Sequence, residues 1–313
     1  WYSRWLGDGW STPEILRVDA GRYDDYDLLA ADSDDIWLAT DTHVAEYSYR
    51  VLLMYHWDGV SWSEPWVLDS PDLEGSYFPD MALDPSGDPW VVWTGVSPTP
   101  YFQPIMYSRW TGESWAAPDT VNADLNNGPG SEIVFDEDVP MVLWNGNQAA
   151  TVEIEYSRLE DVEWTPSALV NLPDSTNDDY DILGACEKNT RGDITAVWSA
   201  GNDHDSYGGD VMATRWTGKS WTPEEEVSVD APAKRDRNPD AALADDGTLW
   251  TAWICYEEIA PPWDTDVRGT SCALTTPVEF GALDAASTGD GVAVTWYGSG
   301  EAADGPFYVW RTL

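Results

Sequence analysis

Short apolar runs separated by turn residues follow one another along the chain, and one stretch shows the pattern clearly. Residues 80–84 form an apolar run, a Pro-Ser-Gly-Asp turn follows, and residues 90–94 are mainly β-branched or aromatic. After a longer connection, a third run at 105–110 enters a tight turn through Gly112 and returns as a fourth run. Such runs, bounded by such turns, are typical of strands. Because no helical period of useful length interrupts them, the pattern predicts four antiparallel strands per unit.

The tight turn recurs about every fifty residues. It is marked by a tryptophan, once a leucine, that is followed five residues later by another tryptophan. In four of the five copies a glycine stands two positions after the first member. A unit that recurs at this spacing indicates a repeat architecture. The pairs are Trp5/Trp10, Trp57/Trp62, Trp110/Trp115, Leu159/Trp164 and Trp216/Trp221.

Backbone geometry explains the glycine in this turn. A tight hairpin turn favours a residue with positive φ, which accounts for Gly112 and its equivalents. The third copy has Asp161 instead, a residue type that tolerates the left-handed conformation. The fifth copy lacks the tryptophan pair, so we expect an irregular outer edge over residues 269–280.

Six four-stranded antiparallel sheets arranged radially account for these repeats, so the predicted fold class is an all-β, six-bladed β-propeller. The start of the chain has the pattern of the outer half of a repeat. We expect it to pair in the C-terminal blade and close the ring, which removes two sheet edges. Because both ends of the chain offer a candidate third strand, seven blades or a fragment of a longer array is the alternative. The predicted single domain spans residues 1–313, with blades at 23–70, 71–122, 123–172, 173–230, 231–280, and 281–313 together with 1–20.

Acidic residues dominate the charge of the chain. The sequence has 57 Asp and Glu against 15 Lys and Arg, a net charge of −42. A field of this sign repels nucleic acid and anionic membranes, which leaves cations, neutral sugars and basic proteins as partners. Such acidity is consistent with a secreted protein or with adaptation to high salt, where screening weakens self-repulsion. The acidity leads us to expect an extracellular or cell-surface location. No stretch approaches the ~20 apolar residues of a membrane span, so we expect no membrane insertion.

The three cysteines are too few and too scattered for a zinc site or a disulfide scaffold. Cys255 and Cys272 flank one predicted hairpin and could pair in an oxidising compartment. The alternative is that both of them, together with Cys186, are small buried hydrophobic residues.

One segment resembles a known repeat. The sequence Tyr-Ser-Arg-Trp-Thr-Gly-Glu-Ser-Trp at 107–115, with Asp-Met-Ala-Leu-Asp at 80–84 ahead of Trp90, resembles the repeat of bacterial sialidase-like β-propellers. In sialidases the Asp-box occupies the same turn between the third and fourth strands, whereas here a Trp-x-Gly-x-x-Trp pattern replaces Ser-x-Asp-x-Gly-x-x-Trp. A similar Trp-rich, six-bladed ring is found in fungal fucose-binding lectins. Resemblance at this level implies a fold, and one fold serves many functions.

Five copies of the repeat have a carboxylate ahead of a strand tryptophan. We expect these carboxylates to begin the innermost strands and to ring the mouth of a central channel. Like charges at close range raise one another's pKa, so such a ring would share protons or bind a hard cation, with calcium as the natural candidate. Alternatively, each carboxylate bonds backbone groups of the next sheet, and recurrence in every copy favours this structural interpretation. The candidate metal ligands are Asp27, Asp80, Glu132, Asp181 and Asp240, and the matching tryptophans are Trp37, Trp90, Trp144, Trp198 and Trp250.

The connections between the second and third strands are long and irregular, whereas the tryptophan turns at the opposite end are uniform. Variable loops on a uniform scaffold are where binding residues usually lie. Aromatic side chains there could stack on sugar rings, and arginines could bind carboxylate groups. The candidate ligand-binding residues are Arg50, Tyr101, Phe102, Tyr207, Arg237, Trp263 and Arg268. A structural role is expected for the arginines that share one repeat position, namely Arg4, Arg109, Arg158 and Arg215.

These features predict a non-catalytic propeller that binds a glycan or a partner protein through its acidic and aromatic loop face, with calcium as a candidate stabilising ion. No catalytic residue is assigned. The resemblance to sialidases implies an alternative, a glycoside hydrolase that binds its substrate carboxylate with three arginines, and this requires Arg50, Arg237 and Arg268 to lie together. A third hypothesis is a structural unit of a cell-surface assembly or filament, with homo-assembly through the terminal strands.

Overall fold

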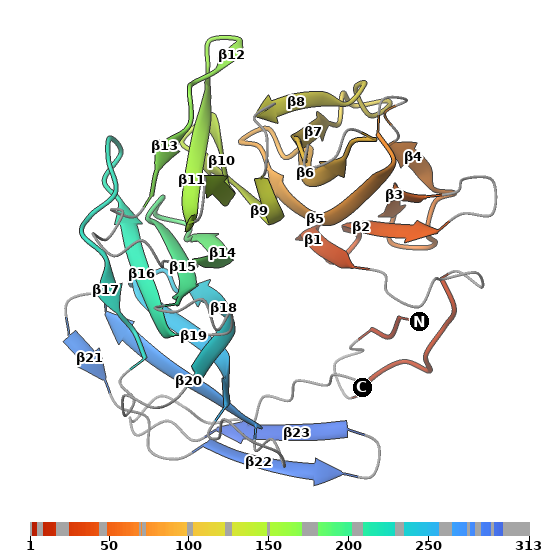
Figure 1. Ribbon diagram of the computed structural model, residues 1–313. Helices are drawn as coiled ribbons and strands as arrows, with labels where there is room; N and C mark the ends of the chain where they lie inside the picture. The colour runs from red at the N-terminus through yellow and green to blue at the C-terminus, as the bar shows by residue number, and fades with distance from the viewer. Residues whose placement is uncertain are drawn as a thin grey trace. The chain divides into compact units, whose positions relative to one another are not determined.

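The structure is a computed structural model, and it describes most of the chain (Figure 1). Within the described residues all regular secondary structure is β, in antiparallel sheets that are mostly four-stranded. The predicted all-β fold of four-stranded antiparallel sheets is confirmed, while the number of blades stays a prediction. No helix in the described part of the chain is long and apolar enough to cross a membrane. The described residues are 2–4, 9–16, 25–43, 49–68, 70, 73–98, 103–122, 127–148, 151–170, 181–201, 209–228, 235–256, 265–273, 276–278, 283–288 and 291–296.

The chain divides into two compact units, and each is described by itself. The first consists of Trp1–Val142 with Ser157–Thr165, and the second of Leu143–Tyr156 with Pro166–Leu313. The expectation that residues 1–313 form a single domain stays a prediction.

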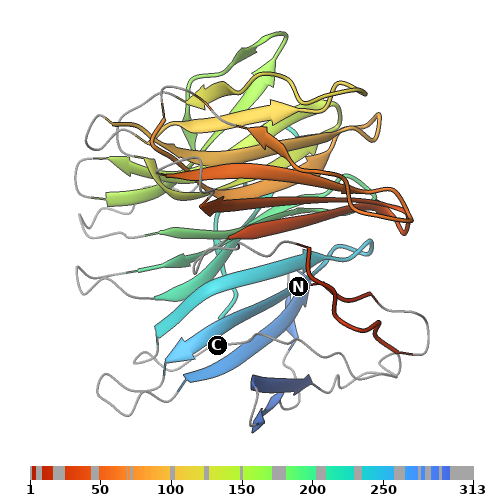
Figure 2. The same cartoon turned by 90° about the vertical axis from the view of Figure 1, so that its right-hand side faces the viewer.

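The first unit contains two complete sheets, each of which follows the chain from its first strand to its fourth. Neighbouring strands run antiparallel, and Figure 2 shows the same strands after a 90° turn. The first sheet is β1 (Tyr26–Asp32), β2 (Asp35–His43), β3 (Arg50–Trp57) and β4 (Trp66–Leu68). The second is β5 (Gly75–Leu83), β6 (Pro89–Val96), β7 (Ile105–Arg109) and β8 (Asp119–Asn122).

A third sheet has residues in both units. Its main path is β9, β10, β11 and β12, and β13 also pairs with β11. The short strands β12 and β13 both pair with β11, β12 at its C-terminal end and β13 near its middle. Together they form the outer strand of this sheet, which follows the tryptophan turn. The strands are β9 (Asn127–Asp136), β10 (Val139–Gln148), β11 (Thr151–Glu160), β12 (Glu163–Trp164) and β13 (Ala168–Leu169).

The second unit has two further four-stranded sheets and a two-stranded one. The expected irregular outer edge of the fifth copy is wrong, because β20 continues to Ala273 and pairs there with β21. The strands are β14 (Ile182–Lys188), β15 (Ile194–Ala200), β16 (Asp210–Trp216), β17 (Glu225–Glu226), β18 (Arg235–Leu243), β19 (Thr248–Tyr256), β20 (Thr265–Ala273), β21 (Thr276–Val278), β22 (Leu283–Thr288) and β23 (Gly291–Trp296).

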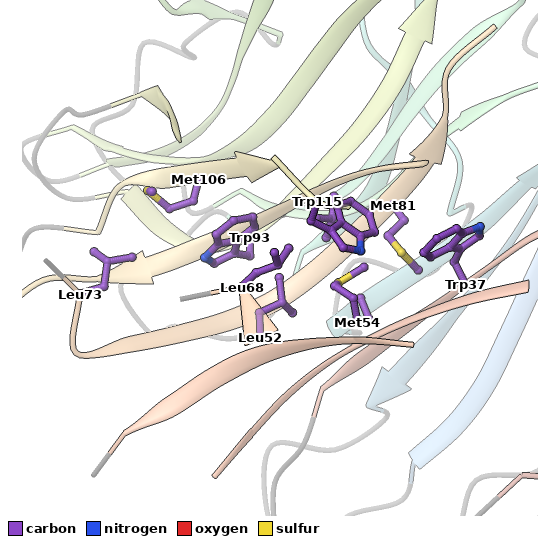
Figure 3. Close-up of a cluster of buried hydrophobic side chains, with 11 residues drawn as sticks. Trp37, Leu52, Met54, Leu68, Leu73, Met81, Trp93, Met106 and Trp115 are labelled. Atoms are coloured by element: carbon purple, nitrogen blue, oxygen red, sulfur yellow. The ribbon is translucent and has the colours of Figure 1, made fainter. Parts of the chain in front are cut away.

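A core of the first unit lies between its two complete sheets (Figure 3). Trp93 on β6 is fully buried, and Met54 from β3 and Met81 from β5 are in the same cluster. The Trp37 ring of the first sheet lies 5.0 Å from the Trp110 ring of the second, measured between centroids. Burial of large aromatic and aliphatic side chains is the main stabilising term for such an interface. The tryptophans of the turn therefore help to hold neighbouring sheets together.

The tryptophan turn has the predicted geometry. Trp110 and Trp115 pair as an isolated antiparallel bridge, and their ring centroids are 5.9 Å apart. Gly112 between them has φ of 90°, and Asp161, which replaces the glycine in the third copy, has φ of 58°. Both residues adopt the left-handed conformation that the sequence predicts for this position.

Strand register defines the position of the repeated carboxylate. Asp80 on β5 pairs with Val92 on β6, and Val92 directly precedes the fully buried Trp93. Asp27 and Asp240 occupy the equivalent place in the first and fifth sheets. The innermost strand begins well before this position in the second sheet, so the carboxylate lies inside the strand and not at its start.

The fourth sheet has an alanine at this position. Ala185 pairs with Val197, which directly precedes the fully buried Trp198. Asp181 lies four residues earlier, just before β14 begins. The prediction that Asp181 shares the repeat position is therefore wrong. By register Trp198 corresponds to Trp93, and the fourth sheet has no carboxylate at the position that Asp80 occupies in the second.

A β-bulge precedes the carboxylate in the second and fifth sheets. In the second sheet the register shifts between Tyr77 and Asp80, and the fifth sheet has an equivalent shift. Phe78, inside the bulge, has φ of 54°, and the equivalent residues Gly130 and Asn238 have φ of 99° and 48°. Glycine and asparagine adopt this conformation readily, whereas a bulky residue with positive φ is an outlier.

The two cysteines of the fifth sheet lie too far apart for a disulfide. Cys255 on β19 is buried and forms no disulfide. In the strand register Cys255 pairs with Asp266, whereas Cys272 pairs with Leu249. Six residues of strand separate these positions, about 20 Å at roughly 3.3 Å per residue. A disulfide requires Cα atoms within about 7 Å. The hypothesis that Cys255 and Cys272 pair is therefore wrong, and Cys186 is also buried and forms no disulfide.

Candidate functional site

A cluster of charged and aromatic side chains, the Arg50 cluster, lies at the end of the first unit where β2 leads toward β3. Asp41 on β2, Arg50 on β3 and Asp25, which directly precedes β1, belong to the first sheet. Tyr77 and Phe78 lie on β5 of the second sheet. The tryptophan turns are at the opposite end of the same strands. The Arg50 cluster is therefore on the side where the sequence predicts ligand-binding loops.

Asp41 is the centre of the Arg50 cluster and is fully buried. Its Oδ1 atom lies 3.0 Å from Nη1 of Arg50 and accepts the backbone N–H of Asp25 at 3.2 Å. Its Oδ2 atom accepts the backbone N–H of Phe78 at 3.2 Å. One carboxylate thus links the second strand of the first sheet, the residue that leads into that sheet, and the bulge of the second sheet.

Burial decides the ionisation of this carboxyl. It raises the pKa of Asp41 to about 7, against the opposing effects of the Asp25 N–H and the Arg50 guanidinium. The neighbouring Asp25 carboxylate raises the pKa further, and the Phe78 N–H lowers it. A buried carboxyl whose pKa is near neutral makes the Arg50 cluster sensitive to pH in the physiological range.

Arg50 is one of the predicted ligand-binding residues, and its guanidinium is engaged inside the protein. The residue is 8% exposed. Besides its contact with Asp41, its Nη1 atom lies 3.6 Å from Oδ2 of Asp25, and its Cζ atom lies 5.2 Å from the centroid of the Tyr77 ring. Two carboxylates and one aromatic face therefore already interact with this guanidinium.

The aromatic pair of the Arg50 cluster is positioned by local backbone features. A Cβ atom on Gly75 would lie 2.5 Å from Cε2 of Tyr77, so this glycine makes room for the tyrosine ring. The Tyr77 and Phe78 rings have centroids 6.2 Å apart at an interplanar angle of 37°. Phe78 is 38% exposed, so part of its ring faces solvent.

A neutral side chain makes the corresponding link in the second unit. Oδ1 of Asn145 accepts the backbone N–H of Leu183 at 2.8 Å. Leu183 stands two residues before Ala185, as Phe78 stands two residues before Asp80. Because an amide suffices to join two sheets in this way, the acid and arginine at Asp41 and Arg50 exceed what the scaffold needs.

The carboxylates Asp27 and Asp80 also link neighbouring sheets. The N–H of Met81 donates to Oδ2 of Asp27 at 2.9 Å, and the N–H of Ile133 donates to Oδ2 of Asp80 at 2.6 Å. Each donor directly follows the carboxylate position of the next sheet. Burial raises the pKa of Asp27, against the effects of the N–H groups of Leu28 and Met81. These contacts are those of the structural interpretation, in which each carboxylate bonds backbone groups of the next sheet.

The other candidate metal ligands lie on the third, fourth and fifth sheets or just before them. Asp240 accepts the N–H of the following Ala241 at 2.8 Å, Glu132 lies on β9 directly before Ile133, and Asp181 is buried beside β14. In the part of the chain that the structure describes, no group of three or more His, Cys, Asp or Glu residues could hold a metal ion. Calcium binding at the predicted ring of carboxylates stays a prediction.

Of the other predicted ligand-binding residues, the structure describes Arg237 and Arg268. Arg237 pairs with Ile254 and Arg268 with Trp253, so these two arginines flank neighbouring positions of β19 in the second unit. Arg50 belongs to the first unit, and the grouping of three arginines that a hydrolase would need stays a prediction. The residues that lie outside the described ranges are Tyr101, Phe102, Tyr207 and Trp263.

The arginines at the shared repeat position contact the scaffold. Each interacts with a turn residue, a tryptophan face or a carboxylate of the strands around it. At the equivalent position in the first sheet, His56 stacks on Trp37 with centroids 4.2 Å apart, and its Nε2 atom lies 2.7 Å from Oδ1 of Asp35. The contacts are Arg4 to the Trp57 ring at 4.3 Å, Arg109 to the Trp90 ring at 5.5 Å, Arg158 to Asp136 at 2.8 Å and Arg215 to the carbonyl of Gly247 at 2.8 Å.

Sequence reasoning missed Asp41 and Phe78. The signal for Asp41 was an acidic residue at the end of a mostly apolar strand, where the third copy has an asparagine. Phe78 had no comparable signal, because its left-handed backbone depends on a bulge and on a carboxylate from another sheet.

Comparisons with known proteins concern the fold. No protein-family model matches the chain, and no curated protein matches it significantly. It is similar to a protein of unknown function from Dyadobacter fermentans DSM 18053, with 16% identity, 88% of this chain and 90% of that chain covered, and a TM-score of 0.55. It is also similar to a mutant α-L-arabinofuranosidase from Fusarium graminearum bound to an iminosugar inhibitor, with 10% identity, 88% of each chain covered and a TM-score of 0.51. For a Hadza microbial sialidase the values are 15% identity, 88% of this chain, 63% of that chain and 0.48.

The four-stranded sheets and the first two of these likenesses define the class of the protein. It has an all-β fold of propeller-like type, built from antiparallel sheets that follow one another along the chain. Identities this low carry the fold alone, so the function must be argued from the site.

Proposed function

We propose that this protein is a non-catalytic, extracellular binding protein that recognises a glycan or a partner protein through the loop end of its sheets. The observation that carries the proposal is the state of Arg50. Its guanidinium is almost fully buried and already contacts Asp41 and Asp25. An arginine in this state is a poor receptor for a substrate carboxylate, because a second anion would have to displace the buried Asp41 side chain. It can still hold the residues of a binding surface in place.

This state of Arg50 weighs against the sialidase-like alternative. That alternative needs free arginines that converge on an acidic sugar, and the bidentate geometry of a guanidinium is valuable only while its donors are available. Removal of one partner from a buried charged pair is destabilising, so a ligand that recruits Arg50 must replace its contacts with Asp41 and Asp25.

The charge of the chain narrows the class of ligand. A net charge of −42 disfavours acidic polymers, whereas neutral sugars are unaffected and basic proteins are attracted. Many glycoside hydrolases share propeller-like folds, and the similarity to an arabinofuranosidase is compatible with a glycan ligand. Calcium is retained in the proposal only as a candidate stabilising ion.

Array screening and turnover assays test the proposal together. Purified protein is applied to an array of neutral and sialylated oligosaccharides, and the same oligosaccharides are incubated with it in solution and analysed by mass spectrometry. The expected result is saturable binding of a glycan, with every oligosaccharide recovered intact, or capture of a basic partner protein in a parallel pull-down from native extracellular matrix. Catalytic cleavage of any glycoside would overturn the non-catalytic part of the proposal.

We also infer that the chain closes as a six-bladed ring, with residues 1–20 completing the last blade. The N-terminal segment supports this, because Oγ of Ser3 donates to the carbonyl of Ser11 at 2.7 Å, as Oγ of Ser108 does to the carbonyl of Ala116 at 2.8 Å. Its first residues thus have the internal bonding of an outer hairpin. Deletion of residues 1–16 should lower Tm, and an unchanged Tm would contradict the inference.

A further inference from the structure

Phe78 combines an unfavourable backbone conformation with an exposed ring. Its φ is 54°, whereas the equivalent positions in the third and fifth sheets hold Gly130 and Asn238. A left-handed conformation is unfavourable for a residue with a Cβ atom, whereas glycine and asparagine adopt it more readily. Stability alone would therefore favour a small residue at this position.

The surrounding structure holds Phe78 in place from both sides. Its N–H donates to Oδ2 of the buried Asp41, and the next residue but one, Asp80, accepts the N–H of Ile133 at 2.6 Å. These bonds connect the bulge to two other sheets. They involve the backbone of residue 78 only, so asparagine or glycine could form them equally well. The scaffold accounts for the conformation and leaves the phenyl ring unexplained.

The ring itself contributes little to the core. Phe78 is 38% exposed and is absent from the core between the first two sheets. Its ring lies beside Tyr77, whose face contacts the Arg50 guanidinium. The result is a partly exposed aromatic surface at the loop end of the sheets, formed by Phe78 beside Tyr77. Strained residues held by their surroundings are concentrated at binding sites.

We propose that Phe78 stacks on the apolar face of a sugar ring, and that the ligand is a neutral glycan. This inference rests on the proposed function and specifies its ligand class and one contact residue. An exposed, fixed aromatic ring suits the C–H face of a sugar, since burial of both surfaces is favourable and little side-chain entropy is lost. A neutral sugar is specified because Arg50 is occupied by Asp41 and Asp25 and the net charge of −42 repels anions.

Substitution of Phe78 separates a binding role from a structural one. The variants are Phe78→Asn, which copies the residue of the fifth sheet, Phe78→Tyr, which retains an aromatic ring, and the control Val60→Asn. Val60 is 83% exposed and lies in the tryptophan turn at the other end of the first sheet. All are compared with the natural protein on the array of neutral and sialylated oligosaccharides, and Tm is measured for each.

We expect the natural protein to bind at least one neutral oligosaccharide. The affinity for it should fall at least tenfold in Phe78→Asn and stay within about threefold in Phe78→Tyr and Val60→Asn. The Tm of Phe78→Asn should be unchanged or higher, because the strain is relieved. A lower Tm would show that the ring is structural, and equal binding by Phe78→Asn would overturn the inference while the proposed function stands. Binding of sialylated oligosaccharides alone, or of a protein alone, would also overturn it. If neither glycan nor protein binds, the proposed function fails as well.

Discussion

Removal of the Asp80 carboxylate tests how neighbouring sheets are joined. In the natural protein Oδ2 of Asp80 accepts the N–H of Ile133, a residue that is only 4% exposed. The substitution Asp80→Ala leaves this buried donor without its acceptor, and water has little access to replace it. The donor–acceptor distance of 2.6 Å is short, as expected for a bond to a charged acceptor.

The expected loss follows from the type of bond. A hydrogen bond to a charged group contributes about 1.5–3 kcal/mol, and an unsatisfied buried N–H costs a similar amount. We therefore expect Asp80→Ala to lower the free energy of unfolding by about 2 kcal/mol. At roughly 2.1 cal/mol/K of unfolding entropy per residue, this corresponds to a decrease in Tm of about 3 °C for a chain that unfolds as one domain. Asp80→Asn retains an acceptor oxygen and should recover most of this loss. Thermal and urea unfolding of the three proteins measure the effect.

The same experiment distinguishes the structural role from calcium binding. If Asp80 joins sheets, EDTA leaves the Tm of the natural protein unchanged, and Asp80→Asn is close to it. If Asp80 binds calcium, EDTA lowers the Tm, added calcium restores it, and Asp80→Asn is as damaging as Asp80→Ala. An Asp80→Ala variant as stable as the natural protein would refute the reasoning from the Ile133 bond.

Three further predictions follow from the described contacts and the charge. Native Asp41 retains a proton up to about pH 7, whereas the unfolded chain releases it near pH 3.8, so its contribution to the free energy of unfolding falls as pH rises through this window. The substitution Asp41→Asn should therefore make the free energy of unfolding less dependent on pH, by up to about 1.4 kcal/mol per pH unit. Urea unfolding measured across this pH range checks it, and the same pH dependence in both proteins would contradict it. Gly112→Ala should destabilise by about 1 kcal/mol and Asp161→Gly should stabilise by up to about 1 kcal/mol, since both positions have positive φ; chemical denaturation checks both signs. An increase in NaCl from about 0.1 M to about 1 M, which shortens the Debye length from ~10 to ~3 Å, should raise Tm by weakening repulsion within a chain of charge −42; no change would show that this repulsion is unimportant.

The fold could be predicted largely from local patterns. The tryptophan turn is determined within a few residues, so Gly112 and Asp161 have the predicted conformation. The position is harder to identify in the fourth sheet, because it holds Ala185 where the second sheet has Asp80. A spacing of thirteen residues, from Asp80 to Trp93 and from Ala185 to Trp198, was available in the sequence and identifies the correct position.

The candidate site was less predictable because it depends on contacts between sheets. Arg50 was selected as an arginine near a loop, but its burial depends on Asp41 and Tyr77, which the chain brings to it from different strands. The left-handed Phe78 results from a bulge and from a bond to another sheet. Such features follow from tertiary packing, and neither residue type nor spacing indicates them.

The central claim is that the protein binds a glycan without cleaving it. Its most direct test is one time-resolved measurement with an oligosaccharide that the array identifies as a ligand. The protein and the oligosaccharide are mixed at concentrations that saturate the site, and native mass spectrometry follows the complex and the free sugar over many hours. The proposed function predicts a stable complex with the oligosaccharide intact at every time point. Appearance of shorter products in proportion to protein concentration would contradict it and identify the protein as a glycoside hydrolase.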